Sequence, residues 1–260
     1  MVYAGIDIGS TTSKVVLLNE DEIIVAYSII RNSYNLAESG REALKIALSK
    51  GGLPQNEISH IISTGYGRRT IKFQDESEPE IICHAKGTFK IIPTCRTIID
   101  IGGQDSKVIE LDERGLVKKF QMNDKCAAGT GRYLDKLAED ILQVGIEQLG
   151  EKSLKSDNPL VISAQCTVFA ESEIISYLSQ GKATEDIIAG MHNSLAKRVI
   201  DMGKSGFVKF KKDTVFSGGV AMNIGMVTAL EHLLNQKVII PKEPQLTAAL
   251  GAALMAKKKS

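Results

Sequence analysis

Residues 7–15, DIGSTTSKV, and residues 100–108, DIGGQDSKV, decide the fold of this 260-residue chain. The two stretches share Asp-Ile-Gly, then three variable residues, then Ser-Lys-Val, at an offset of 93 residues (100 minus 7). Apolar runs enter each copy at 3–6 and 97–99 and leave it at 15–18 and 108–111. Each copy is therefore predicted to form a strand, a glycine turn and a second strand.

Repetition of a whole hairpin predicts two lobes of related fold. We place the first lobe at residues 1–95 and the second at residues 96–260, with the C-terminal helix able to pack back on the first lobe. Between the hairpins and beyond them, short apolar runs alternate with segments of helical periodicity, which predicts a layered α/β fold. The further strands are expected at 22–27, 58–63, 161–163, 214–216 and 238–240. The helices are expected at 36–48, 129–142, 167–179, 184–202, 224–234 and 245–255.

Composition excludes several classes of partner. Apolar residues make up 43% of the chain, enough for a sizeable core, and 32 Lys and Arg balance 31 Asp and Glu. A balanced surface does not concentrate nucleic acid. No apolar run approaches the roughly 20 residues that span a bilayer, so we expect a cytoplasmic protein without a membrane or nucleic-acid partner.

The two glycine turns have the chemistry of a phosphate site. Gly9, Gly102 and Gly103 allow backbone N–H groups to approach a phosphate closely. Ser10, Thr11, Thr12 and Ser13 add hydroxyl donors, and Lys14 adds a positive charge.

Carboxylates stand at both strand ends. Asp7 and Asp100 suit water-mediated binding of Mg²⁺, which takes few protein oxygens. In the second turn, Gln104 is predicted to orient an attacking water, and Asp105 is a possible base. These four residues are the predicted catalytic set.

A third segment, residues 215–223, reads VFSGGVAMN and ends a predicted strand in a double glycine before a helix. It resembles the adenosine motif of the actin, sugar-kinase and Hsp70 superfamily, and the two hairpins resemble that superfamily's phosphate motifs in the same order. The resemblance implies an actin-like, ribonuclease H-like fold of two duplicated lobes with ATP or ADP in the cleft between them. It also implies nucleotide contacts from Gly218, Gly219, Asn223 and, in the closing small-residue helix, Gly251.

Four cysteines, Cys83, Cys95, Cys126 and Cys166, show no CxxC spacing. Cys126 and Cys166 each lie beside small residues at the predicted mouth of a helix, where partial positive charge favours a thiolate or an anionic iron–sulfur cluster. The alternative is that each is a small buried hydrophobic residue.

The cysteine segments 120–134 and 161–173, with Ser63-Thr64-Gly65-Tyr66-Gly67-Arg68, resemble the activator component of (R)-2-hydroxyacyl-CoA dehydratases, also called component A or archerase. That resemblance implies a homodimer that shares one [4Fe–4S] cluster, each subunit giving the thiolates of Cys126 and Cys166. Cys83 and Cys95 are then packed thiols. The Gly65 to Arg68 turn has no assigned role.

The resemblance further implies a function in reductive activation. An electron from ferredoxin or flavodoxin would pass through the cluster into the dehydratase, driven by ATP binding and hydrolysis. Three alternatives remain: an ATPase subunit of a benzoyl-CoA reductase-type system, a small-molecule kinase of the sugar-kinase superfamily, and a structural or chaperone ATPase.

Overall fold

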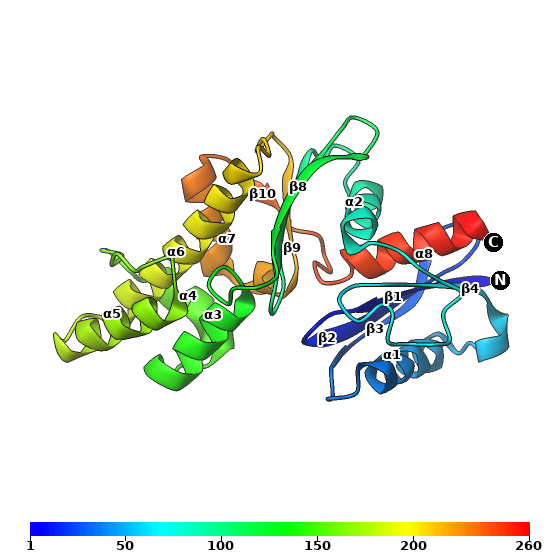
Figure 1. Ribbon diagram of the computed structural model, residues 1–260, viewed down its shortest axis with the longest axis horizontal. Helices are drawn as coiled ribbons and strands as arrows, with labels where there is room; N and C mark the ends of the chain where they lie inside the picture. The colour runs from blue at the N-terminus through cyan, green and yellow to red at the C-terminus, as the bar shows by residue number, and fades with distance from the viewer. The chain divides into compact units, whose positions relative to one another are not determined.

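Two five-stranded sheets organise the chain in the computed structural model, which describes residues 1–260 (Figure 1). Apart from Leu111 and Val117, which are strand ends of the second sheet assigned to the first unit, each sheet lies in its own compact unit. Unit 1 consists of Met1–Cys95, Leu111–Val117 and Gln245–Ser260, and unit 2 of Arg96–Glu110 and Lys118–Pro244. The last helix therefore belongs to unit 1, although its place in the chain follows all of unit 2.

The sheet of unit 1 has the strand order β3-β2-β1-β4-β5. Strand β1 pairs antiparallel with β2 and parallel with β4. All seven residues of β1 are buried, as expected for a central strand covered on both faces. The strands are β1 (Val2–Ile8), β2 (Thr12–Leu18), β3 (Ile24–Arg31), β4 (Ile58–Thr64) and β5 (Glu76–Ser77).

Helices cover both faces of this sheet. Alternate residues of β2 point to opposite faces, so Val15 and Leu17 pack in the cluster with α1 (Leu36–Gly51), whereas Val16 and Leu18 pack against α8 (Thr247–Lys259). The remaining helices of the unit are α2 (Glu80–Ile91), which packs on α8, and the 3₁₀ turn η1 (Gln55–Glu57).

Helix α1 shows how local sequence sets an element's ends. The side chain of Asn35 accepts hydrogen bonds from the backbone N–H groups of Ala37 and Glu38, which satisfies two of the unpaired donors at the helix start. Gly52 ends the helix in the left-handed conformation at φ +62°, which glycine adopts without a Cβ penalty. The helix predicted at 36–48 is confirmed and continues to Gly51.

The sheet of unit 2 has the order β10-β9-β6-β7-β8. Strand β6 pairs antiparallel with β7 and parallel with β9. This order repeats that of unit 1 when β6 is matched to β1, β7 to β2, β8 to β3 and β9 to β4, so the repeated hairpin marks a repeated topology. The strands are β6 (Thr97–Ile101), β7 (Ser106–Leu111), β8 (Val117–Asn123), β9 (Thr214–Ser217) and β10 (Val238–Ile239).

Most of the helices belong to unit 2 and share one large apolar cluster with β6, β7 and β9. Helix α6 contributes the most to this cluster and buries Ile187, Met191 and Leu195 along one face. The helical segments of the unit are α3 (Gly131–Lys136), the π-helical turn η2 (Leu137–Leu142), η3 (Ile146–Gln148), α4 (Leu149–Ser153), α5 (Thr167–Ser179), α6 (Thr184–Ser205), η4 (Gly219–Met222) and α7 (Ile224–Leu234).

Two sequence expectations need correction, and two of the longer elements were missed. Residues 161–163, predicted as a strand, form no strand, because side chains satisfy their backbone: Glu173 accepts from the N–H of Ser163 and Tyr177 donates to the carbonyl of Val161. The helix expected at 129–142 starts at Gly131 and becomes a π-helical turn at Leu137. Helix α2 and strand β8 were not predicted.

None of the helices combines the length and the apolar character that a membrane span requires.

Candidate functional site

The first hairpin closes on itself through its own charged pair. Gly9 donates its N–H to the carbonyl of Thr12 at 3.0 Å, and Lys14 Nζ lies 3.1 Å from Asp7 Oδ2. Asp7 and Lys14 are opposite partners in the β1–β2 register. Asp7 is only 4% exposed, and its Oδ1 has no hydrogen-bond partner. A buried carboxylate oxygen without a donor costs free energy unless a ligand reaches it, and such an oxygen suits a hydrated Mg²⁺.

Asn32 fixes the conformation of the same turn, and sequence reasoning missed it. Its Oδ1 accepts from Ser13 Oγ at 2.7 Å, and its Nδ2 donates to the carbonyl of Gly9 at 2.8 Å. Its backbone N–H donates to the carbonyl of Thr11 at 2.9 Å. The residue is recognisable only once β3 is placed beside β2, since nothing in its local sequence marks it.

The turn that starts at Gly65, which had no assigned role, lies on Asp7. Gly65 has φ +88°, and a Cβ there would lie 2.3 Å from Asp7 Oδ1. Gly67 donates its N–H to the carbonyl of Ile8 at 2.8 Å, and Arg68 Nη1 donates to the carbonyl of Gly65 at 3.1 Å. Glycine is therefore required by conformation and by the close approach to the carboxylate.

The second hairpin repeats the charged pair in a more buried form. Lys107 is 1% exposed, and its Nζ lies 3.3 Å from Asp100 Oδ2 and 2.8 Å from Asp105 Oδ2. Ser217 Oγ donates to Asp100 Oδ1 at 2.9 Å. Asp105 thus contacts a buried lysine, while Gln104 is exposed in the turn. The backbone N–H of Gly102 donates to the carbonyl of Asp105 at 2.9 Å and closes the turn.

The double-glycine segment joins this hairpin within unit 2. Strand β9 pairs with β6 so that Ser217 stands opposite Asp100. Gly218 has φ +86°, and a Cβ there would lie 2.3 Å from the carbonyl oxygen of Ile101. Gly219 then begins η4. The predicted adenosine motif and the predicted second phosphate turn are therefore neighbours in space.

Asn223 caps helix α7 and forms a hydrogen bond with the side chain of His192. The Oδ1 of Asn223 accepts from the N–H groups of Gly225 at 2.9 Å and Met226 at 3.2 Å. Its Nδ2 lies 3.1 Å from His192 Nε2. His192 is 1% exposed, and burial lowers the pKa of its imidazole to about 4. The neutral ring therefore accepts the amide hydrogen at Nε2 and carries its own hydrogen on Nδ1, which has no partner.

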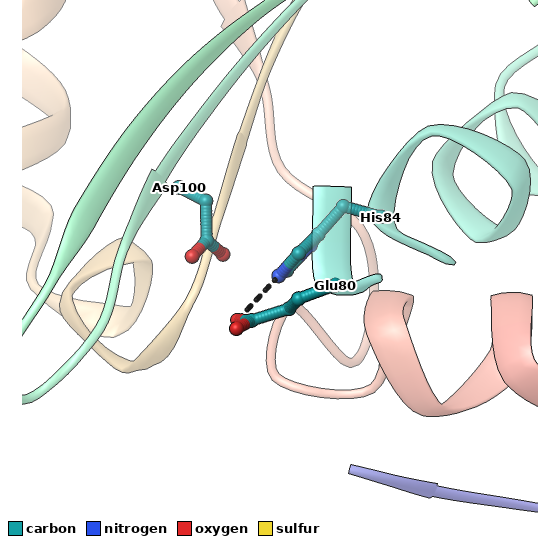
Figure 2. Close-up of side chains that lie close together, drawn as sticks. All are labelled: Glu80, His84 and Asp100. Atoms are coloured by element: carbon teal, nitrogen blue, oxygen red, sulfur yellow. Dashed lines mark ion pairs between the residues drawn. The ribbon is translucent and has the colours of Figure 1, made fainter. Parts of the chain in front are cut away.

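Gly251 occupies a packing position in unit 1. A Cβ on Gly251 would lie 1.8 Å from the carbonyl oxygen of Cys83, because α8 crosses α2 at this point. The next residue of α2, His84, shares a hydrogen bond of 3.0 Å between its Nδ1 and Thr247 Oγ1. Its Nε2 lies 3.4 Å from Glu80 Oε1 (Figure 2).

The four cysteines divide into two classes. Cys83 and Cys95 are fully buried, and burial raises the pKa of Cys83 to about 12. Cys126 and Cys166 are partly exposed. A neutral, buried thiol is a poor metal ligand, since the thiolate is the ligating form. Only Cys126 and Cys166 have the access that a ligand needs.

Arg198 of α6 connects the two loops that carry these cysteines. Its Nη1 donates to the carbonyls of Ala164 at 2.6 Å and Gln165 at 3.1 Å, next to Cys166. Its Cδ and Nε would lie 3.1 Å from a Cβ on Gly129, three residues after Cys126. One guanidinium therefore lies against both loops and places positive charge beside them.

The two cysteines differ in their relation to a helix. Cys166 is the N-cap residue of α5, as the sequence predicted. Cys126 precedes the start of α3, whose N-cap is Thr130. Asn123 fixes the Cys126 turn, with Nδ2 donating to the carbonyl of Cys126 at 2.8 Å and Oδ1 accepting from its N–H at 3.2 Å. A turn built by Asn123, not a helix end, positions this thiol.

Apolar side chains stand in solvent around Cys166. Val168 is 61% exposed, Phe169 58% and Ile175 52%, all on α5, and Val161 just before it is 86% exposed. Large exposed apolar groups gathered on one element mark an interaction surface.

Comparisons of the sequence and of the structure with known proteins all lead to the same family. The model of the BadF/BadG/BcrA/BcrD ATPase family matches residues 4–256. The 2-hydroxyisocaproyl-CoA dehydratase activator of Clostridioides difficile is 48% identical over 98% of this chain and 95% of its own length.

Two solved structures resemble the chain closely. The activator of the 2-hydroxyisocaproyl-CoA dehydratase from Clostridium difficile with bound ADPNP superimposes with a TM-score of 0.93 at 47% identity, over 100% of this chain and 95% of that one. The Acidaminococcus fermentans (R)-2-hydroxyglutaryl-CoA dehydratase component A superimposes with a TM-score of 0.95 at 43% identity, over 100% and 98%. The predicted two-lobed, actin-like ATPase fold is confirmed.

Proposed function

Since the chain belongs to the BadF/BadG/BcrA/BcrD ATPase family, we propose that it is an ATP-dependent activator of a 2-hydroxyacyl-CoA dehydratase. Relatives that share almost half of its residues over nearly the whole chain are named as such activators. In this function the dehydratase is the partner that removes water from the substrate, and the ATPase drives an electron into it.

One observation carries the electron-transfer part of the proposal: two partly exposed cysteines lie in loops that share Arg198. Cys126 and Cys166 would hold a [4Fe–4S] cluster as thiolates, and the neighbouring guanidinium would offset part of the negative charge that four thiolates bring. When bound, such a cluster supplies one electron at a time at low potential.

A second copy of the chain would complete the ligand set. A four-iron cluster takes four cysteine ligands, and each chain offers two accessible thiols. Two-fold symmetry supplies the other two from the same positions. The exposed apolar residues of α5 beside Cys166 support an interface there. Ferredoxin or flavodoxin is the proposed electron donor.

The nucleotide chemistry rests on the two hairpins and the double-glycine segment. Gly9, Gly102 and Gly103 would give N–H groups to phosphates, and Asp7 and Asp100 would hold a hydrated Mg²⁺. Gln104 would orient water, which a neutral amide does without strongly deprotonating it, so turnover is expected to be slow. Gly218, Gly219 and Asn223 would contact the adenosine.

Two other functions make different predictions. An ATPase subunit of a benzoyl-CoA reductase-type system would carry the same cluster but would not activate a 2-hydroxyacyl-CoA dehydratase. A small-molecule kinase has no use for accessible thiols in loops joined by one arginine, and it would be colourless. The cysteine arrangement favours the activator over the kinase.

Iron analysis of the anaerobically purified protein tests the proposal. We expect a brown protein with four iron atoms per dimer. Cys126→Ser and Cys166→Ser should each abolish the cluster, whereas Cys83→Ser and Cys95→Ser, the matched buried controls, should retain it. Four iron atoms in a monomer, or loss of iron only in the Cys83 variant, would show that the ligands are assigned wrongly.

A further inference from the structure

A pocket of about 380 Å³ lies in unit 1 between α2, α8 and the turn that follows β2. Its volume is in the range of small-ligand sites, roughly 300–1,000 Å³. Leu254 and Phe89 give it an apolar wall, while the other lining residues are charged. They are Glu22, Lys86, Lys90, Lys257 and Lys258.

The lysines converge because of where they stand on their helices. Lys86 and Lys90 are four residues apart on α2 and therefore lie on one face. Lys257 and Lys258 occupy the last turn of α8, whose unpaired carbonyls favour cations. Four ammonium groups and one carboxylate leave the pocket with a net charge of +3 (4 minus 1).

Glu22 engages only two of the four lysines. It forms ion pairs with Lys90 and with Lys257, the latter at 3.2 Å. The hydrogen bond from Lys90, followed by that from Lys257, lowers the pKa of Glu22. Lys86 and Lys258 make no ion pair. Like charges gathered in one pocket repel one another until a counter-charge arrives.

The backbone of Glu22 is held in an unfavourable conformation. Its φ is +61°, a region in which a residue with a Cβ is uncommon. The side chain of Asn19 fixes this turn by accepting the N–H groups of Asp21 at 3.0 Å and Ile23 at 2.9 Å. Strained residues held by their surroundings cluster at ligand sites. Here the turn carries the carboxylate that orients Lys90 and Lys257.

The pocket is separate from the first glycine hairpin. Glu22 follows the end of β2 at Leu18, which pairs with Tyr3, whereas Gly9 follows the opposite end of β1. The five residue steps of strand from Tyr3 to Ile8 span about 17 Å. A phosphate held by Gly9 therefore does not reach Lys86 or Lys258.

We propose that this pocket is a second anion site whose ligand is a small organic phosphate. The phosphate contacts Lys86 and Lys258, since lysine binds phosphate as a point charge, and an apolar group of the ligand contacts Phe89 and Leu254. A bound phosphate ties α2 to α8, because one lysine comes from each helix. The proposal does not depend on the cluster or on the dehydratase.

Calorimetric titration of the full-length protein with phenyl phosphate tests the site, with inorganic pyrophosphate as the probe that lacks an apolar group. Both titrations are run with and without saturating ADPNP and Mg²⁺. We expect phenyl phosphate to bind in the presence of ADPNP. Its affinity should exceed that of nonspecific binding at the same salt concentration. This affinity should fall as the salt rises from 0.02 to 0.15 M, which shortens the screening length from about 20 to 8 Å. Phenyl phosphate should also raise the melting temperature.

Variants of opposite charge make the test specific. The double variant K86E/K258E should lose at least tenfold in affinity, and the charge-neutral K86Q/K258Q keeps the test open if the first does not fold. E22Q should tighten binding severalfold, because it removes the competing carboxylate. K45E, an exposed lysine on α1 outside the pocket, is the matched control and should change nothing.

Several outcomes would overturn the site. Displacement of phenyl phosphate by ADPNP would assign the binding to the glycine hairpins. Equal losses in K45E and in K86E/K258E would show nonspecific attraction to surface charge. Weaker binding in E22Q, or no binding to the wild-type protein, would mean that Lys86 and Lys258 do not form a phosphate site.

Discussion

Asp7 and Asp100 occupy matching positions in the two hairpins, yet their surroundings differ. Each pairs with the lysine opposite it in the register, Lys14 or Lys107. Asp100 also accepts from Ser217, whereas Asp7 Oδ1 has no partner. Asp7 therefore keeps one oxygen without a hydrogen-bond donor, as a contact to a hydrated cation requires. Asp100 is instead held in position by Ser217 and Lys107.

Removal of either carboxylate is expected to slow ATP hydrolysis. Asp7→Ala and Asp100→Ala should each lower the rate by about a hundredfold, the scale seen when one preorganised electrostatic group is lost. Asp21→Ala, in an exposed turn, is the control. Steady-state phosphate release measures the effect, and thermal melts check the fold. Wild-type rates in both hairpin variants would place the chemistry elsewhere.

His192 makes stability depend on pH. Burial lowers the folded pKa of His192 from the usual 6.5 to about 4, so the unfolded chain binds more protons between these two values. The free energy of unfolding should therefore fall as pH drops from about 6.5 to 4, by up to about 3 kcal/mol. Urea melts at pH 7, 5 and 4 measure it. His192→Gln lacks this titration, so the difference between wild type and variant should shrink at low pH; parallel curves would contradict the assignment.

At the level of elements, glycine decides how closely helices approach. Helices α2 and α8 touch backbone to backbone where Gly87 faces Thr247 and Gly251 faces Cys83. A Cβ on Gly87 would lie 1.9 Å from the carbonyl oxygen of Thr247. This distance, like the 1.8 Å from a Cβ on Gly251 to the carbonyl oxygen of Cys83, is far below van der Waals contact. The two helices can pack this closely only because both glycines lack a side chain.

Adding one methyl group at this crossing is expected to separate the two helices. Gly251→Ala should destabilise the protein by about 3 kcal/mol or more, because backbone atoms rather than a flexible side chain must move. Gly52→Ala is the comparison, since a Cβ there meets open space. This variant should lose only about 1 kcal/mol, the cost of a non-glycine residue at the left-handed φ of +62°. Denaturant titration compares them. Equal losses would mean that α8 shifts without cost.

For the whole molecule, nucleotide state is expected to control electron delivery to the dehydratase. The cysteine loops and the second phosphate turn belong to the same unit, where Gly131 and Arg132 of α3 donate their N–H groups to the carbonyls of Gly102 and Gly103 at 2.8 and 2.9 Å. A movement of that turn on nucleotide binding would therefore reach the helix that follows Cys126. A ligand that favours one conformation shifts the population toward it.

Anaerobic electron transfer from dithionite-reduced protein to its dehydratase measures this coupling. We expect transfer with ATP, little with ADP, and a state with ADPNP that distinguishes binding from hydrolysis. The Cys126→Ser protein, which should carry no cluster, is the control for direct reduction by dithionite. Equal transfer with all three nucleotides would eliminate gating.

The sequence alone determined the repeated hairpin and most of the helices and strands around it. The period of two residues in strands and the spacing of apolar residues in helices are local properties, so α5 and α7 were predicted to the residue, and α1 at its start but three residues short at its end. Motif order also predicted the fold. These features need no knowledge of which segments meet.

Tertiary structure decided the contacts that join distant segments. Arg198 lies far in sequence from both cysteine loops, Asn32 reaches the first turn from the neighbouring strand, and His192 holds Asn223 across the core of unit 2. Residues 161–163 have the composition of a strand, but side chains of α5 form hydrogen bonds with their backbone in place of a neighbouring strand. Hydrogen bonds and burial depend on which atoms meet after folding, and a one-dimensional pattern does not contain that information.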